Sequence, residues 1–279
     1  MKILLSLLSY GKLTGSEMYV YELAKELLKL KYQVSIASLA TDVNSELVAR
    51  LQDPHLKYYQ LGDVPNDYDI VHSSQTKPTE LVKLMFKCPI IQTIHSEILD
   101  EYESPVDGIS HYIAIRPKIF ERLVDKYPTT KISEVYNGVD KTRFFPTENH
   151  KQKVIVFCGT LNKLRLEAIR DLKSYIEKGY KLVFVGDGFE GMQDTDDIMY
   201  LSPRWNIEEI LHNAEMTAGI MLGRTTIEGY QCGLGAIIYT VDKDGHIESK
   251  QETGPRPQKQ YYSDYMAKEM DKIYRRYVK

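Results

Sequence analysis

Short apolar runs alternate with segments of helical periodicity along the whole chain. In the segment 16–30, apolar residues such as Val20, Leu23 and Leu27 recur every three or four positions, as on one face of an amphipathic helix. The shorter runs are rich in branched aliphatic residues, which favour strands. Because alternating strands and helices are typical of parallel sheets covered by helices, the pattern predicts an α/β fold.

The predicted elements fall into two series. The first contains strands at residues 3–8, 33–38, 70–72, 89–94, 112–115 and 134–136 and helices at 16–30, 79–86 and 117–126. The second contains strands at 154–158, 181–186, 198–201, 217–221 and 236–240 and helices at 165–178, 207–214 and 225–232. We expect an exposed loop at 242–259, which is rich in glycine, proline, lysine and glutamine. A final helix is expected to begin at Ser263, whose side chain is a good amino-terminal cap.

A linker separates the two series. The stretch from Tyr136 to Lys153 contains the turn-forming pair Asn137-Gly138, then Pro146 and several polar residues. We therefore expect three parts, which are a Rossmann-like domain at 1–147, a second one at 148–260 and a carboxyl-terminal helix at 261–279. Ligands bind at the carboxyl ends of strands in open α/β sheets, so the crevice between two such sheets is the expected site.

Composition argues against several classes of protein. With 279 residues, 43% of them hydrophobic, the chain is long enough for two domains with buried cores. A formal net charge of −3 provides no overall positive field that would attract nucleic acid or an anionic membrane. The apolar run at 3–8 is too short to span a bilayer and no cleavage site follows it. We therefore expect a cytoplasmic protein without a transmembrane segment.

The cysteine and histidine positions argue against a metal site. Cys88, Cys158 and Cys232 are far apart and form no CxxC pair, which favours a reducing compartment. The histidines form no HExxH motif. We therefore expect neither a bound metal nor a resident cofactor.

Two predicted strand-to-helix loops contain residues suited to binding an anion. The first loop enters its helix through Gly15 and Ser16, where backbone amides could face a phosphate. The alternative is a flexible turn capped by the serine. In the second loop, Gly159 follows the predicted strand, and Lys163 and Arg165 stand where the next helix begins. Two cations there suit a diphosphate, although a solvated basic turn has the same composition.

The segment GRTTIEGYQCG, from Gly223 to Gly233, has two interpretations. Thr225 and Glu228 have the Thr-x-x-Glu spacing of a capping box, in which the glutamate turns back to a helix amide. Alternatively, Gly223 and Arg224 let backbone amides and a guanidinium approach a phosphate, while Glu228 accepts hydrogen bonds from the two hydroxyls of a ribose.

His95 follows the apolar run PIIQTI, at the expected carboxyl end of a strand. A histidine at this position can hydrogen-bond a sugar hydroxyl or transfer a proton. A structural histidine, satisfied by its neighbours, is the alternative.

The order of these features resembles the retaining glycosyltransferases of the GT-B fold, specifically glycosyltransferase family four. The glycine loop and first helix of that family are similar to TGSEMYVYELAKELLK, and two of its first-domain strands to YDIVHSSQ and IIQTIHSE. The family's interdomain linker is similar to VYNGVDKTRFFP. Its donor domain is similar to VFCGTLNK, LVFVGDGFE and IEGYQCGLGAIIYTVD. Single motifs are weak, but their order and spacing over nearly the whole chain are specific.

The resemblance implies a fold and a reaction. The fold is two Rossmann-like α/β domains whose parallel sheets face each other across a cleft, with the last helix crossing back to the first domain. The reaction moves a sugar from a nucleotide diphosphate-sugar, most often a UDP-sugar or GDP-sugar, to an acceptor hydroxyl, with retention and without metal. The acceptor is left open among glycans, lipid-linked sugars, proteins and nucleic acids, and contact with the inner face of a membrane is compatible with the family.

The resemblance also implies roles for the candidate residues. Glu228 would bind the donor ribose, His95 would lie near the transferred sugar, and the loop Ser202–Arg204 would face the base. The residues beside the donor phosphates would be Gly15, Ser16, Thr160, Lys163, Arg165, Gly223, Arg224, Thr225 and Thr226. Arg165 and Arg224 would act in catalysis by stabilising the leaving diphosphate.

Two positions depart from the family pattern. Ile220 stands where the first glutamate of the motif is expected, and Thr160 stands where the family has an arginine. These departures keep a second function open, which is a non-catalytic subunit that binds a nucleotide-sugar or glycan. A DNA-base glycosyltransferase is a further alternative, and an epimerase of the same fold is a third.

Overall fold

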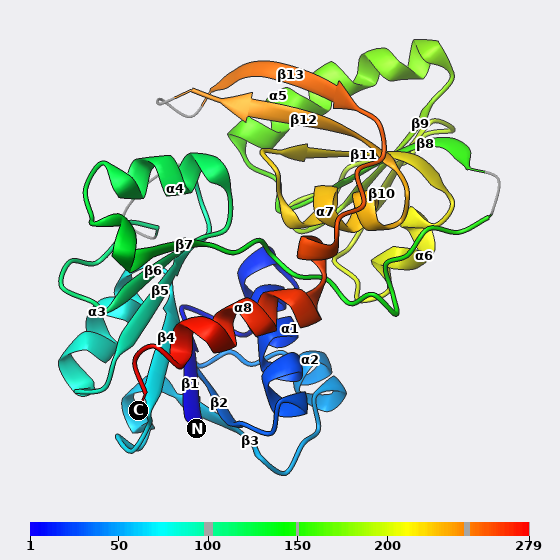
Figure 1. The fold of residues 1–279 in the computed structure, drawn as a ribbon. Coiled ribbons are helices and arrows are strands. Elements are labelled where there is room, and N and C mark those ends of the chain that lie inside the picture. The colour runs from blue at the N-terminus through cyan, green and yellow to red at the C-terminus, as the bar shows by residue number, and fades with distance from the viewer. Residues whose placement is uncertain (98–102, 149–150, 243–245, 279) are drawn as a thin grey trace. The chain divides into compact units, whose positions relative to one another are not determined.

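The computed structural model describes residues 1–97, 103–148, 151–242 and 246–278. These residues form one sheet of seven strands and one sheet of six strands (Figure 1). The chain divides into two compact units. Unit 1 consists of Met1–Gly138 and Tyr262–Lys279, and unit 2 consists of Val139–Tyr261.

Unit 1 contains a seven-stranded sheet in which every neighbouring pair is parallel, in the order β3-β2-β1-β4-β5-β6-β7. The strands are β1 (Lys2–Leu7), β2 (Gln33–Ser38), β3 (Leu56–Gln60), β4 (Ile70–Ser74), β5 (Ile90–Ile94), β6 (His111–Ala114) and β7 (Ile132–Glu134). The helices are α1 (Gly15–Lys29), α2 (Ser45–Arg50), α3 (Thr76–Met85), α4 (Pro117–Val124) and α8 (Ser263–Tyr274).

Successive residues of β4 pack on opposite faces of this sheet, as the two-residue period of a strand requires. Val71 belongs to the apolar core that contains Val82 of α3 and Ile119 of α4. His72 points to the other face, where its Nδ1 shares a hydrogen bond with the hydroxyl of Tyr274 in α8. The predicted carboxyl-terminal helix therefore packs within unit 1, beside α1 (Figure 1).

Unit 2 contains a six-stranded sheet in the order β10-β9-β8-β11-β12-β13. Its strands are β8 (Gln152–Cys158), β9 (Lys181–Val185), β10 (Ile198–Leu201), β11 (Ala214–Ile220), β12 (Gly235–Val241) and β13 (Ile247–Thr253). Its helices are α5 (Lys163–Leu172), α6 (Ile207–Leu211) and α7 (Arg224–Gln231). Only β13 among these strands is antiparallel to its neighbour. A core containing Phe157, Leu172 and Phe184 lies between α5 and the sheet.

Several sequence-based predictions were wrong in detail. Part of the loop predicted at 242–259 is the edge strand β13, which pairs with β12 through its backbone although most of its side chains are exposed. Residues 243–245 of that loop lie outside the described residues. The strand predicted at 134–136 is β7, two residues earlier, and the helix predicted at 165–178 ends at Leu172, where a 3-10 helix follows.

The predicted cap at Ser263 was also wrong. Tyr262 is the N-cap residue of α8, and Ser263 is the first helical residue. The Ser263 hydroxyl donates instead to a carboxylate oxygen of Glu26 in α1, across 3.4 Å. In the described part of the chain, no helix combines the length and the apolar character that crossing a membrane requires.

Candidate functional site

The strand order of unit 2 reverses direction between β8 and β11. The chain runs from β8 to β9 on one side and from β11 to β12 on the other, so the loops that follow β8 and β11 diverge. Open α/β sheets bind ligands outside the carboxyl ends of strands at such a switch point. The helices that begin there are α5, at Lys163, and α7, at Arg224.

The loop after β8 depends on two glycines in close contact. Gly159 has a φ of +147° and Gly186, after β9, has a φ of +156°. A Cβ atom on Gly186 would lie 2.2 Å from the carbonyl oxygen of Gly159, so a side chain cannot be accommodated there without displacing backbone. Asn162 then caps α5 by accepting a hydrogen bond from the backbone N–H of Arg165, across 2.9 Å. The loop between β8 and α5 is therefore fixed by the contact with Gly186 at one end and by the Asn162 cap at the other.

Arg165 folds back over this loop. Its guanidinium lies against Gly159, where an added Cβ would be 2.5 Å from Nε, and one terminal nitrogen donates to the carbonyl oxygen of Thr160 across 2.9 Å. Burial lowers the pKa of Arg165, but the group remains cationic because an arginine pKa starts above 12. No carboxylate pairs with Arg165 in the described residues. Lys163 and Thr160 are exposed near it. Among the described residues, the positive charge at this end of α5 is therefore not neutralised by a carboxylate.

The start of α7 differs from the capping-box interpretation. Gly223 is the N-cap residue, and it has no side chain that could cap the helix. The preceding Met221 has a left-handed φ of +60°, and its carbonyl accepts from the N–H of Gly223 across 2.9 Å. The capping box of Thr225 and Glu228 is wrong, because Thr225 lies inside the helix rather than at the N-cap.

Glu228 is paired with Arg224 one turn earlier. Nε of Arg224 lies 2.7 Å from Oε1 of Glu228, and the two side chains are 8% and 7% exposed. Two residues of the predicted site therefore contact each other. Thr226, in contrast, is fully buried and faces β11, since a Cβ on Gly219 would lie 2.9 Å from its hydroxyl. The structure places Thr226 in the packing of α7 against the sheet rather than among the exposed polar groups.

Cys158, which was not a predicted site residue, links the end of β8 to α7. It is the last residue of β8, and its thiol interacts with the hydroxyl of Thr225 in α7. Burial, together with the negative charge of Glu228, raises the pKa of Cys158 to about 12, so the group stays a neutral thiol at pH 7. Its contact with Thr225 is direct evidence that the ends of β8 and α7 lie together.

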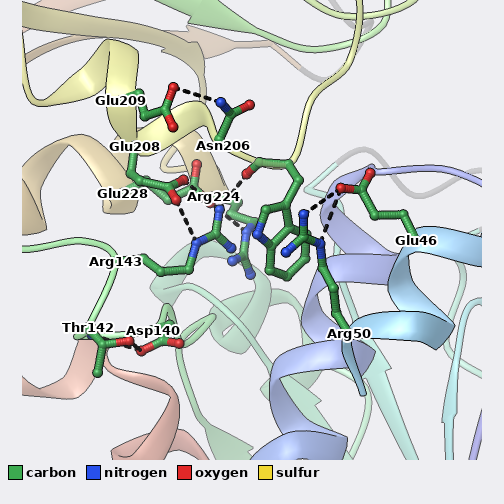
Figure 2. Close-up of polar contacts among 11 residues, drawn as sticks. Glu46, Arg50, Asp140, Thr142, Arg143, Asn206, Glu208, Glu209, Arg224 and Glu228 are labelled. Carbon is green, nitrogen blue, oxygen red and sulfur yellow. Dashed lines mark hydrogen bonds and ion pairs between the residues drawn. The ribbon is translucent and has the colours of Figure 1, made fainter. Parts of the chain in front are cut away.

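The loop after β10 is fixed by Arg143, a residue of the predicted linker. Arg143 Nε donates to Glu208 Oε1 across 3.1 Å (Figure 2). The guanidinium carbon of Arg143 lies 4.1 Å from the ring centroid of Trp205. A terminal nitrogen of Arg143 also donates to the Trp205 carbonyl oxygen. These contacts hold the segment that follows the exposed residues Ser202–Arg204. That segment lies after the carboxyl end of a strand, as expected for a ligand-binding loop.

In unit 1 the strand order reverses between β1 and β4. Gly15 is the first residue of α1, one residue before the predicted start, and Thr14 is its N-cap residue. Ser16 donates across 2.9 Å to the carboxylate of Glu17, which also accepts from the Thr14 hydroxyl. Burial raises the pKa of Glu17. A carboxylate therefore already occupies this helix end, which makes Gly15 and Ser16 a weaker anion site than the two helix ends of unit 2.

His95 lies just after β5, next to the carboxyl end of β4. Its Nε2 is 3.1 Å from the Ser74 hydroxyl, and the ring meets Tyr19 edge to face with the centroids 4.9 Å apart. Burial, and to a smaller extent the charge of Arg116, lowers the pKa of His95 to about 3, so the imidazole is neutral at pH 7. Across the described residues, Nδ1 of His95 has no hydrogen-bond partner.

Ile220 adds no polar group to the candidate site. Ile220 is the last residue of β11 and packs against the apolar core of unit 2. Within the residues that the structure describes, no group of three or more His, Cys, Asp or Glu side chains is arranged to hold a metal ion.

Residues 13–143 match a family model described as Glycosyltransferase Family 4. None of the curated proteins compared with the sequence matches it.

Several solved structures have a similar fold, and their matches cover most or all of the chain. Anabaena Alr3699/HepE, in complex with UDP-glucose, has a TM-score of 0.68 at 14% identity, and the match covers 97% of this chain and 89% of that one. UDP-N-acetylglucosamine 2-epimerase from Rickettsia bellii has a TM-score of 0.63 at 12% identity, covering 100% and 97%. An alpha-glucosyltransferase (AGT) in complex with UDP has a TM-score of 0.57 at 9% identity, covering 86% and 80%. At these identities the likeness establishes a shared fold.

Proposed function

The chain is a glycosyltransferase of GT-B fold that carries a Glycosyltransferase Family 4 domain over residues 13–143, and we propose that it transfers a sugar from a nucleoside diphosphate-sugar to an acceptor hydroxyl. Unit 2 binds the donor and unit 1 binds the acceptor. The nucleotide is UDP, a choice supported by the solved structures of this fold that hold UDP-glucose or UDP.

The observation that carries this proposal is the set of charges at the switch point of unit 2. Arg165 has no carboxylate partner in the described residues, and the helices α5 and α7 both begin at this edge of the sheet. A diphosphate diester carries two negative charges, and a guanidinium together with helix amides is suited to bind them. Glu228 lies one turn into α7, where a carboxylate can accept hydrogen bonds from both ribose hydroxyls.

The reaction proceeds with retention and needs no protein nucleophile. The bond between the sugar C1 and the diphosphate oxygen breaks, and the acceptor oxygen bonds to C1 on the same face. The acceptor proton passes to an oxygen of the leaving diphosphate. Arg165 and the helix amides stabilise the negative charge that develops on that group, which is the contribution expected from preorganised donors. Neutral His95 offers its Nδ1 to a hydroxyl of the sugar or the acceptor.

Replacement of Arg165 by Ala tests the donor site. We expect UDP affinity, measured by calorimetry, and turnover of the UDP-sugar to fall by about tenfold or more, since a hydrogen bond to a charged group contributes about 1.5–3 kcal/mol. The matched control is Arg170→Ala, which removes an exposed arginine from the same helix. Equal UDP affinity in the two variants would show that the donor does not bind here. Unchanged turnover in the presence of EDTA is expected if no metal takes part.

Two other functions give different results in the same assays. A non-catalytic subunit, the alternative suggested by Ile220 in place of a motif glutamate, binds UDP but does not consume any UDP-sugar. A DNA-base glycosyltransferase is the alternative suggested by the fold shared with an alpha-glucosyltransferase that was solved with UDP and a 13-mer DNA. Such an enzyme consumes UDP-sugar only with DNA and binds DNA with an affinity that falls steeply with salt.

A further inference from the structure

A buried arginine outside the predicted site contacts the backbone of His95. Arg116 follows β6 as the N-cap residue of α4, and it is 7% exposed. One terminal nitrogen of its guanidinium donates to the carbonyl oxygen of His95. The other lies 3.4 Å from a carboxylate oxygen of Glu97, which is also buried. Because β5 and β6 are neighbours in the sheet, the residues that follow them are brought side by side.

The other side of the same peptide segment is held by a carboxylate. The backbone N–H of His95 donates to Glu103 Oε2 across 3.0 Å. His95 is therefore held by a negative group at its N–H and by a positive group at its C=O. Hydrogen bonds to charged groups are about twice as strong as neutral ones, so this arrangement fixes the backbone of His95 more firmly than a loop contact would.

The side chain of His95 is oriented by different neighbours. Ser74 holds Nε2, and the ring of Tyr19 from α1 packs against the imidazole. The titratable and charged groups around it are Tyr19 on α1, His72 on β4, Glu103 in the loop after β5, and Arg116 with Glu97 after β6 and β5. With Nε2 and both backbone groups fixed, Nδ1 of His95 is the remaining polar atom of the residue.

We propose that Arg116 is a positioning residue, which fixes the backbone of His95 so that the imidazole presents Nδ1 to the sugar or acceptor. This inference rests on the proposed function, because it assumes that unit 1 binds a hydroxyl ligand beside His95. A buried guanidinium costs several kcal/mol in desolvation, so a role beyond packing accounts for its presence at a loop.

Arg116→Gln is the direct test. Losing the charged donor lets the His95 peptide shift, and a displacement of 1 Å at a reacting group costs about a hundredfold in rate. We expect kcat to fall ten- to hundredfold while the UDP dissociation constant changes by less than twofold, because the donor is assigned to unit 2. Arg116→Lys, which keeps a cationic donor, should recover part of kcat.

The matched control is Lys118→Gln. Lys118 is an exposed cation near the same carboxylate, with 3.8 Å between its Nζ and Oε2 of Glu97. A kcat for Arg116→Gln equal to that of Lys118→Gln overturns the inference and leaves the proposed function standing. Absence of UDP binding and turnover in the wild type overturns the proposed function itself.

A measurement on the wild type decides the question if Arg116→Gln does not fold. Nitrogen-15 spectra of the imidazoles, with the His95 signal assigned from His95→Gln, should show one neutral tautomer of His95 that does not titrate between pH 5 and 8. A His95 ring that exchanges between tautomers, or that protonates near pH 6.5, would mean that its surroundings do not fix it, and the inference would fail.

Discussion

Nε of Arg224 donates a hydrogen bond to Oε1 of Glu228 across 2.7 Å, and both side chains are more than nine-tenths buried. The two residues are four apart on α7, the spacing at which helical side chains meet. A buried carboxylate needs such a partner, since an unpaired charge in the interior is costly. The pair therefore fixes the direction of the Glu228 carboxylate before any ligand binds.

Glu228→Gln should weaken nucleoside binding. The amide keeps the shape of the carboxylate but has one acceptor oxygen and no charge, so its hydrogen bonds to ribose hydroxyls are weaker. We expect the dissociation constants of both UDP and uridine to rise about tenfold or more, because bonds to charged groups contribute about 1.5–3 kcal/mol. Calorimetry with the two ligands provides the measurement, and Glu190→Gln, at an exposed position of the same unit, is the control. An unchanged uridine affinity would contradict the ribose assignment.

Arg224→Gln should destabilise unit 2 more than the double variant does. Removing the guanidinium leaves Glu228 buried without its cation, and breaking one side of a buried pair costs about 3–5 kcal/mol. Adding Glu228→Gln removes the uncompensated charge, so part of the loss should be recovered. Urea unfolding of the two single variants and the double variant measures the coupling free energy. If the effects of the two substitutions simply add, the pair makes no contribution of its own.

Gly186→Ala should disrupt the loop that positions Arg165. The new methyl group would lie 2.2 Å from the Gly159 carbonyl oxygen, at a φ of +156° that side chains rarely adopt. We expect a loss of about 2 kcal/mol or more in the free energy of unfolding and a weaker affinity for UDP. Gly254→Ala is the control, because nothing lies within 4 Å of its added Cβ. Equal unfolding midpoints for the two variants would show that the close approach of the glycines is not important.

The sequence predicted the parts of the fold that buried apolar runs determine. The strands at Gln33–Ser38 and Ile198–Leu201 have the predicted limits, because their branched and aromatic residues favour strands. The first of these strands is largely buried and the second is mostly half-buried. It did not predict β13, whose residues Glu248 to Glu252 are exposed and polar. That strand is held by backbone pairing with β12, which depends on tertiary structure rather than on side-chain pattern.

In the candidate site too, the sequence predicted what residue type indicates and missed what tertiary structure decides. Arg165 and Glu228 stand out in the sequence because their residue types are suited to phosphate and ribose. Whether Glu228 takes part in a capping box depended on which residue is the N-cap of α7. That is decided by the left-handed turn at Met221, which no local propensity favours. Arg116 escaped notice because its contact with His95 links residues 21 apart that meet only through the pairing of β5 and β6.

Acid should destabilise the protein through its buried histidines. Burial, with smaller effects of His95 and His111, lowers the pKa of His72 to about 3, and its ring is held between Tyr274 and Thr93. An unfolded histidine has a pKa of about 6.5, so between pH 6.5 and 3 the unfolded chain binds a proton that the folded chain does not. The contribution of His72 to the free energy of unfolding is fully present above pH 6.5 and is lost as the pH falls toward 3. The loss from pH 6.5 to 5 is about 2 kcal/mol, since one pKa unit corresponds to about 1.4 kcal/mol. Urea unfolding at pH 7.5 and pH 5 measures this loss in the free energy of unfolding. The loss should be smaller in His72→Gln than in the wild type. The control His55→Gln, at an exposed position, should lose as much as the wild type. An identical loss in all three proteins would mean that His72 is not the titrating group.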